Sequence, residues 1–195
     1  MGVGEATVSW RVRLARVAGW LTTLPYRLRR DRIEIGPGLL GNGRLHITGP
    51  GRVVLGAGVN AWSHAEVNRL ITTDETALIS VGANARLNGC TLIAARGIDI
   101  GPDCVLGSCE VRDHMPVPDR FSADDPGPQP VVIESNVWIG GQVAILPGVR
   151  VGRNSVVGLH AVVFEDVPAD CIVAGNPARV VRRLDQTQRP PGAEP

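Results

Sequence analysis

Hydrophobic residues recur every six positions over the C-terminal half of the chain. From residue 133, six consecutive hexads open with Ile or Val, often place Gly second, and carry a small or β-branched residue fifth. The opening residues are Ile133, Ile139, Ile145, Val151, Val157 and Val163. A period of six fits neither an α-helix nor a simply alternating strand. It predicts a chain that runs straight for a few residues, turns and repeats, so that three sides close a triangular coil.

The same pattern extends upstream in a less regular form. Three further hexads open at Val81, Leu87 and Ile93, and two more open at Ile100 and Leu106 after a one-residue slip near Asp99. Coils of this kind stack at strand spacing, about 4.8 Å, with the aliphatic positions pointing inward. Gly, Asn and Asp between them suit corners with positive φ. The sequence therefore predicts an all-β fold, a parallel β-helix over residues 33–174.

The N-terminal arm, residues 1–32, has a helical pattern instead. Over residues 6–30 the apolar side chains fall on one helical face, and arginines flank that face. The stripe comprises Leu14, Val17, Ala18, Leu21, Leu24 and Leu28. Pro25 is expected to kink or interrupt the helix. Two interpretations stay open: a cap over the open end of the β-helix, which we favour because repeat folds need one, and contact with an anionic membrane surface.

Two segments depart from the repeat. Residues 112–131 form a long loop rich in Pro and Asp, and loops of this length in compact folds are usually functional or mobile. After Gly175 the chain leaves the coil, and residues 175–195 are expected to form a short basic segment followed by a disordered tail from residue 185.

Composition narrows the function classes. The chain has 195 residues, 44% of them apolar, and a formal net charge of +1, which gives no sign of nucleic-acid binding. Its four cysteines show no zinc-ligand spacing, and we expect idle thiols in a reducing compartment. No secretory leader pattern and no apolar run of membrane-spanning length, roughly 20 residues, is visible. We therefore expect a cytoplasmic protein, with the inner membrane surface as the site of any helix contact.

The hexads resemble those of the hexapeptide-repeat acyltransferases. Residues 136–158 (NVWIGGQVAILPGVRVGRNSVVG) and 167–183 (VPADCIVAGNPARVVRR) are similar to the maltose/galactoside O-acetyltransferase branch and to acetyltransferases of polysaccharide and O-antigen synthesis. The resemblance implies a left-handed β-helix, a homotrimer, and transfer of an acetyl group from acetyl-CoA to a sugar or glycan hydroxyl, with no metal required.

The resemblance also implies where the chemistry lies. His114, at the start of the long loop, matches the catalytic His, and a near-neutral pKa makes His a natural general base. Asp113 would orient the ring or touch the acceptor, although alternation along an extended chain argues against a direct pair with His114. Asn88 matches an acceptor-binding Asn, or is a corner Asn in the left-handed region.

The same resemblance assigns the donor site. Gly141 and Leu159 match positions where the pantetheine arm of CoA runs along the coil. Arg179 and Arg182 match positions that bind the nucleotide of CoA. The alternative for the arginines is solvated surface charge. The chain departs from the family at Leu159-His160, where the family usually has small residues, and at Phe164-Glu165, where it often has Thr-Lys. The larger side chains of Leu159 and His160 would narrow the groove expected for the cofactor, and the charge of Glu165 would repel its phosphates.

Other functions remain as alternatives. Zinc hydratases of this fold use histidines close in sequence, which His46, His64, His114 and His160 are not. A non-catalytic β-helix scaffold is favoured by the departures and opposed by His114 with its loop. N-acetylation of an amino-sugar nucleotide also stays open.

Overall fold

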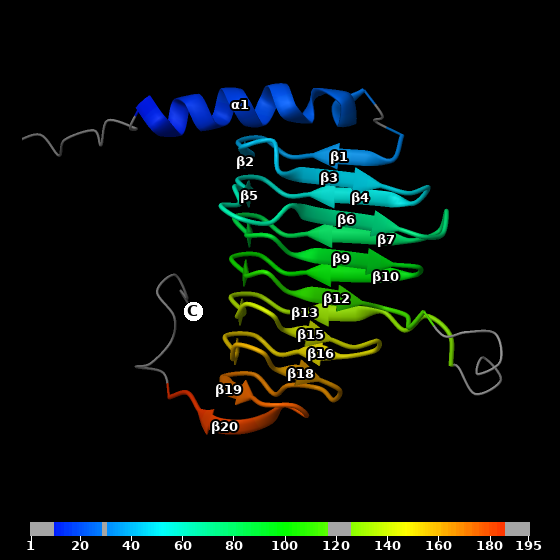
Figure 1. Ribbon diagram of the computed structural model, residues 1–195, viewed down its shortest axis with the longest axis vertical. Helices are drawn as coiled ribbons and strands as arrows, with labels where there is room; N and C mark the ends of the chain where they lie inside the picture. The colour runs from blue at the N-terminus through cyan, green and yellow to red at the C-terminus, as the bar shows by residue number, and fades with distance from the viewer. Residues whose placement is uncertain (1–9, 29–30, 117–125, 186–195) are drawn as a thin grey trace, which may run out of the picture.

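The computed structural model describes residues 10–28, 31–116 and 126–185 as a three-sided column of stacked coils beneath one helix (Figure 1). Each coil contributes a short strand to each of three sheets, named A, B and C here. The strands of each sheet are parallel throughout, apart from the last pair in sheet B. The predicted left-handed β-helix is thus confirmed as the fold class.

The strands follow the order A, B, C along the chain. Sheet A contains β1 (Ile33–Ile35), β4 (Arg52–Leu55), β7 (Leu78–Val81), β10 (Gly97–Ile100), β13 (Val131–Ile133) and β16 (Arg150–Val151). Sheet B contains β2 (Leu40–Gly41), β5 (Asn60–Ala61), β8 (Arg86–Leu87), β11 (Val105–Leu106), β14 (Trp138–Ile139), β17 (Val156–Val157), β19 (Cys171–Ala174) and β20 (Arg179–Arg183). Sheet C contains β3 (Leu45–Thr48), β6 (Asn68–Thr72), β9 (Thr91–Ala94), β12 (Glu110–Arg112), β15 (Ala144–Ile145) and β18 (Val162–Val163).

The core is the inside of this column. All six aliphatic residues that open the hexads from Ile133 onward are at most 1% exposed. Residues one full coil apart pair in the sheets, as Ile133 does with Val151 and Ile139 with Val157. The predicted coil of three hexads is therefore correct over this part of the chain. Each coil buries its small aliphatic residues against those of the next, which explains how a core with few aromatics is filled.

The predicted register is wrong at Ile93. Strand β9 buries Leu92 and Ala94, while Ile93 is only partly buried. The coil is one residue shorter before this strand, where the amide oxygen of Asn68 accepts hydrogen bonds from the backbone N–H groups of Gly89 and Cys90. The side-chain amide of one coil thus tightens the corner of the next, so the slip precedes Ile93.

The helix α1 (Trp10–Arg27) lies across the end of the column, next to β1 and β2 (Figure 1). It contains Pro25. The contact face is small and polar: a Cβ on Gly19 would stand 2.8 Å from the carbonyl oxygen of Leu39. Thr23 is buried, and the Tyr26 hydroxyl donates a hydrogen bond to the carbonyl of Leu45. The interpretation of the helix as a cap agrees with this position.

The apolar stripe does not form that contact. Val17, Leu21, Leu24 and Leu28 are all exposed, together with Trp20. The apolar stripe is therefore not the face that packs on the column, because Gly19 lets the helix backbone approach the first coil from the opposite face. The side chains of Leu14 and Ala18 lie outside the described part of the structure.

The remaining departures from the repeat occur where the sequence places them. Strand β12 ends at Arg112 and β13 begins at Val131, and the described residues between them, 113–116 and 126–130, belong to no strand. At the other end, β20 folds back antiparallel on β19 and closes that edge of sheet B. Residues 6–9 and 29–30 of the predicted helix, 117–125 of the loop and 186–195 of the tail lie outside the described residues.

Candidate active site

The site begins at the corner between sheets C and A, just after β12. His114 has its Nδ1 2.7 Å from Oδ1 of Asp113, and its side chain is 22% exposed. Asp113 is completely buried. Its carboxylate also accepts hydrogen bonds from the backbone N–H groups of Ala95, Arg96 and Gly97 in the previous coil, at 2.6–3.1 Å. The imidazole is therefore tethered to a carboxylate that the backbone itself holds in place.

This pairing corrects the argument from strand alternation. Adjacent side chains point to opposite sides only while the chain is extended. Strand β12 has already ended at Arg112, and both Asp113 and His114 lie in a bend. The bend lets the two side chains meet. The burial of Asp113 favours the orienting role over direct contact with an acceptor.

Sequence reasoning missed the three amides that fix Asp113. They are backbone groups, so no residue type signals them. Their spacing does carry information: Ala95 and Asp113 are 18 residues apart, one coil, so the β-helix places them on neighbouring rungs of one corner.

Asn88, Gly141 and Leu159 lie on a different corner, the one that joins sheet B to sheet C. We call this the donor corner; it comprises residues 88–90, 107–109, 140–143, 158–161 and 175–178 of successive coils. Leu159 reaches back over Gly141, since a Cβ on Gly141 would lie 3.5 Å from its Cδ2. The backbone N–H of His160 also donates to the carbonyl of Gly141. These two predicted donor-site residues are thus direct neighbours.

The donor corner is continuous from Asn88 to the last strand. The hydroxyl of Ser108 lies 3.5 Å from the carbonyl of Asn88, and the N–H of Gln142 donates to the carbonyl of Ser108. At the other end, Gly158 packs on Ala174, which is the residue paired with Arg179 in β20. Arg182 lies on the same strand, and both arginines are exposed. Four coils and the closing strand therefore form one linear surface.

The residues that depart from the family pattern lie on this surface or beside it. Leu159 is 69% exposed, and His160 occupies a left-handed corner position with φ +59°. Phe164 is also exposed, on the corner between sheets C and A. Glu165 lies 3.7 Å from Arg179, with both side chains largely exposed, so the ion pair is worth little and leaves Arg179 accessible. The larger side chains at these positions lie on the surface, outside the packed interior of the coil.

The two parts of the site lie on different corners of one chain. Strand β12 crosses sheet C from the donor corner at Ser108 to His114, six residues on, which spans up to roughly 20 Å of extended chain. A general base must come within about 3 Å of the proton it removes. The corner with His114 and the donor corner of the same chain therefore do not meet across sheet C.

A shallow groove of about 430 Å³ runs beside the corner that carries His114. It lies on the outer face of sheet A, over β7, β10 and β13. Ser80, Arg96 and Asp99 supply polar groups to it, and Pro130 closes the end nearest the loop. Arg96 and Gly97, which line the groove, are also two of the residues whose amides hold Asp113. The groove is thus joined to the His114 corner through the backbone.

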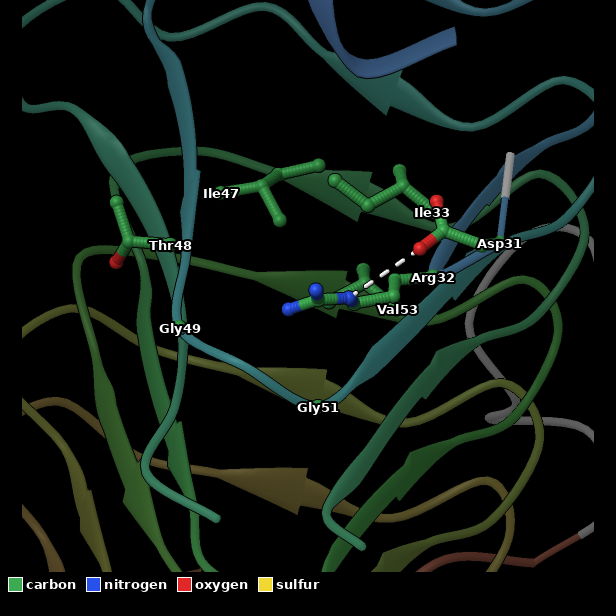
Figure 2. A pocket seen from close by; sticks show the side chains of 8 residues that line it. All are labelled: Asp31, Arg32, Ile33, Ile47, Thr48, Gly49, Gly51 and Val53. Atoms are coloured by element: carbon green, nitrogen blue, oxygen red, sulfur yellow. Dashed lines mark hydrogen bonds and ion pairs between the residues drawn. The ribbon is translucent and has the colours of Figure 1, made fainter. Parts of the chain in front are cut away.

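A second cavity, of about 420 Å³, lies far from His114, at the helix end of the column (Figure 2). Its lining includes Ile33, Ile47 and Val53, and its two ionisable residues, Asp31 and Arg32, pair with each other at 3.4 Å. It holds no histidine, cysteine or lysine. The chemistry that His114 supports therefore lies elsewhere.

The cysteines offer no nucleophile. All four are buried. Burial raises the pKa of Cys90 to about 12 and that of Cys104 to about 11, and it raises the pKa of Cys109 well above its ordinary value. The reactive form is the thiolate, so these three groups are inert at neutral pH. Within the described ranges, no three His, Cys, Asp or Glu side chains gather in a way that could hold a metal ion.

The comparisons with known proteins fit this architecture. Residues 130–165 match the model of the bacterial transferase hexapeptide, six repeats. The match shows the hexapeptide repeat over this part of the chain. This match confirms the resemblance to hexapeptide-repeat acyltransferases on the hexads that begin at Ile133.

Among curated proteins, this hexapeptide-repeat chain is 49% identical over 57 residues to a candidate acetyltransferase of Saccharomyces cerevisiae, covering 29% of each chain. It is 36% identical over 99 residues to a candidate acetyltransferase of Schizosaccharomyces pombe, covering 49% of this chain and 48% of the relative. The chain thus spans less than half the length of either relative.

Solved structures show the same fold. The N-acyltransferase AntD of Bacillus cereus, in complex with dTDP and 3-hydroxybutyryl-CoA, superposes with a TM-score of 0.61 at 18% identity over 84% of this chain and 89% of that one. The polySia-specific acetyltransferase NeuO gives a TM-score of 0.50 at 22% identity over 84% and 92% of the two chains. No helix within the described residues combines the length and the hydropathy that crossing a membrane requires.

Proposed function

We propose that the protein is an O-acetyltransferase that moves an acetyl group from acetyl-CoA to a hydroxyl of a sugar or glycan precursor. The observation that carries the proposal is the tether of His114 to the buried Asp113, at 2.7 Å, with three backbone amides behind it. A surface histidine without a catalytic role does not need such support.

The tether suits a general base. An ionised carboxylate can only accept hydrogen bonds, so Nδ1 of His114 carries the proton in this pair and Nε2 keeps its lone pair. Nε2 takes the proton of the acceptor hydroxyl as the oxygen attacks the thioester carbonyl carbon. The carbon–sulfur bond then breaks, and the imidazolium returns the proton to the departing thiolate of CoA. Asp113 acts as a positioning residue, and Asn88 would contact the acceptor.

The donor corner supports the acetyl-CoA part of the proposal. Gly141 and Leu159 are neighbours on a corner that runs along successive coils, which is the direction an extended pantetheine arm would follow. Exposed Arg179 and Arg182 stand at its end, where phosphates would bind. The solved relative AntD was crystallised with a CoA thioester, which is consistent with this class of donor.

Because the base and the donor corner are separate within one chain, we propose that the site forms between two copies. The His114 corner of one subunit would face the donor corner of its neighbour. Such a contact joins two different surfaces, and it forms a ring when the rotation between subunits closes. The family resemblance implies a homotrimer.

Calorimetric titration of acetyl-CoA into the full chain tests the donor. We expect micromolar binding, about −8 kcal/mol, to both the wild type and His114→Ala. A failure to bind at millimolar acetyl-CoA would refute the acetyl-CoA proposal and leave a larger acyl donor or a non-catalytic scaffold.

Release of CoA thiol in the presence of a sugar panel tests the mechanism. His114→Ala should lower the rate by about 10²- to 10⁴-fold in a protein that still folds, as its melting curve checks. His64→Ala, a change of the same residue type at an exposed position outside the site, is the matched control and should retain full activity. Wild-type rates in His114→Ala would refute the mechanism. Transfer to amino sugars alone would replace it with N-acetylation.

A further inference from the structure

Helix α1 has two faces of opposite character. At 100° per residue, Gly19, Thr23 and Tyr26 lie within about 60° of one another, and this is the face that packs on the first coil. The centre of the apolar stripe lies about 160° around the helix from Gly19. The stripe therefore points away from the column.

The described residues of the stripe are exposed, together with the neighbouring Trp20. The exposed fractions are 56% at Val17, 53% at Trp20, 55% at Leu21, 39% at Leu24 and 80% at Leu28. Their spacing repeats at three and four residues, so they form one contiguous strip rather than scattered side chains. A contiguous apolar strip of this kind marks a surface that binds a partner.

The charge of the same segment identifies the partner. Residues 10–30 contain six arginines and no Asp or Glu. A second copy of this helix would bring like charges together, whereas an anionic surface would be attracted. A basic helix with a Trp- and Leu-containing apolar face is also the composition that lies in the interface of a bilayer. The segment thus combines the two features that an anionic lipid surface recognises.

We propose that α1 docks the protein on an anionic lipid bilayer, with the helix in the plane of the interface and Trp20, Leu21, Leu24 and Leu28 inserted among the headgroups. The helix lies across one end of the column (Figure 1), so the β-helix projects away from the membrane with both candidate corners in water. The inference does not depend on the proposed acetyl transfer.

Flotation with lipid vesicles tests the proposal on the full chain. The wild type should float with phosphatidylglycerol vesicles, float poorly with phosphatidylcholine vesicles, and dissociate as salt rises because the attraction is screened. Trp20→Ser/Leu24→Ser should bind phosphatidylglycerol vesicles at least about tenfold more weakly, since two large apolar side chains no longer leave water. Both positions are exposed, so circular dichroism melting curves should stay unchanged.

A matched pair of single variants separates insertion from a general loss of apolar surface. Trp20→Ser should weaken flotation, whereas Trp62→Ser, at a 39% exposed tryptophan in the loop after β5, should not. The proposal is overturned if the wild type fails to float with phosphatidylglycerol vesicles or if the two variants bind alike. Sedimentation velocity completes the test: if Trp20→Ser/Leu24→Ser changes the oligomeric state, the stripe faces a second copy and the membrane proposal is wrong.

Discussion

Two corners of the β-helix use the same backbone conformation for different purposes. Where sheet A passes to sheet B, the left-handed residues of successive coils are Asn84, Asp103, Asn136, Asn154 and Asp170, with φ of 54–59°. Their side chains bond along the column: Asn84 donates to Asp103, Asn136 to Asn154, and Asn154 to Asp170, at 2.8–3.1 Å. We call this the ladder corner.

The donor corner has the same φ but a different chemistry. Gln142 and His160 adopt φ of 57° and 59°, and both side chains are exposed. Left-handed corners are needed wherever the coil turns, whatever the side chain does. At the ladder corner the side chains hydrogen-bond to one another, whereas at the donor corner they are exposed to solvent. The comparison teaches that the first corner is built for stability and the second is available to a ligand.

The two corners should differ most in the stability lost when a glycine is replaced by alanine. A Cβ on Gly152, at the ladder corner, would stand 2.4 Å from the backbone nitrogen of Ala169, which cannot move aside. Gly152→Ala should therefore cost about 3 kcal/mol of unfolding free energy. At this chain length each kcal/mol lowers Tm by roughly 2–4 °C.

Gly141→Ala, at the donor corner, should leave Tm unchanged, because its Cβ would meet Leu159 at an ordinary 3.5 Å. Calorimetric melting of both variants measures the contrast. Equal shifts in Tm would contradict the distinction between the corners.

A second contrast uses two residues with the same φ of 59°, Asn154 and His160. Asn154→Ala removes the buried side-chain amide that hydrogen-bonds to both Asn136 and Asp170. The free energy of unfolding should therefore fall by about 2 kcal/mol. His160→Ala should cost no more than about 0.5 kcal/mol, as expected for an exposed side chain. Urea unfolding of both variants provides the measurement, and a cost at His160 as large as that at Asn154 would refute the contrast.

Removal of a donor-corner arginine should change binding rather than stability. Arg182→Ala is expected to weaken acetyl-CoA binding by about fivefold, or about 1 kcal/mol for an exposed charge. Arg52→Ala, an exposed arginine at the far end of sheet A, is the control and should bind as the wild type does. Titration calorimetry compares the two. An equal loss in both variants would mean that only overall charge matters.

The smallest expected effect concerns Glu134, which begins the ladder corner of its coil. The backbone N–H of Arg153 and the guanidinium of Arg150 hold the pKa of Glu134 below its ordinary value. A lowered pKa in the folded state adds stability above the unfolded pKa, and this stability is lost as pH falls through the folded pKa. The Tm difference between wild type and Glu134→Gln should thus reflect about 1 kcal/mol at pH 7 and shrink between about pH 5 and pH 3. A difference that does not change with pH would show that the charge contributes nothing.

The period of six determined the fold by itself. Aliphatic residues six apart can be buried together only if the chain turns after each short straight run, and the structure buries each such residue from Ile133 to Val163. The position of His114 also followed from the sequence, because the repeat breaks immediately before it. The same reasoning placed Ile93 one residue out of register, since nothing local reveals that Asn68, in another coil, shortens that corner.

Only the tertiary structure decided how side chains from different coils meet. The amides of Ala95, Arg96 and Gly97 reach Asp113 because one coil stacks on the next, and a bend lets Asp113 pair with His114 against strand alternation. Helix α1 is a second example. Its apolar pattern predicts an amphipathic helix but not which face packs on the β-helix. The close approach at Gly19 places the apolar stripe on the outer side. Periodicity records which residues share a face, whereas packing across the column determines what that face contacts.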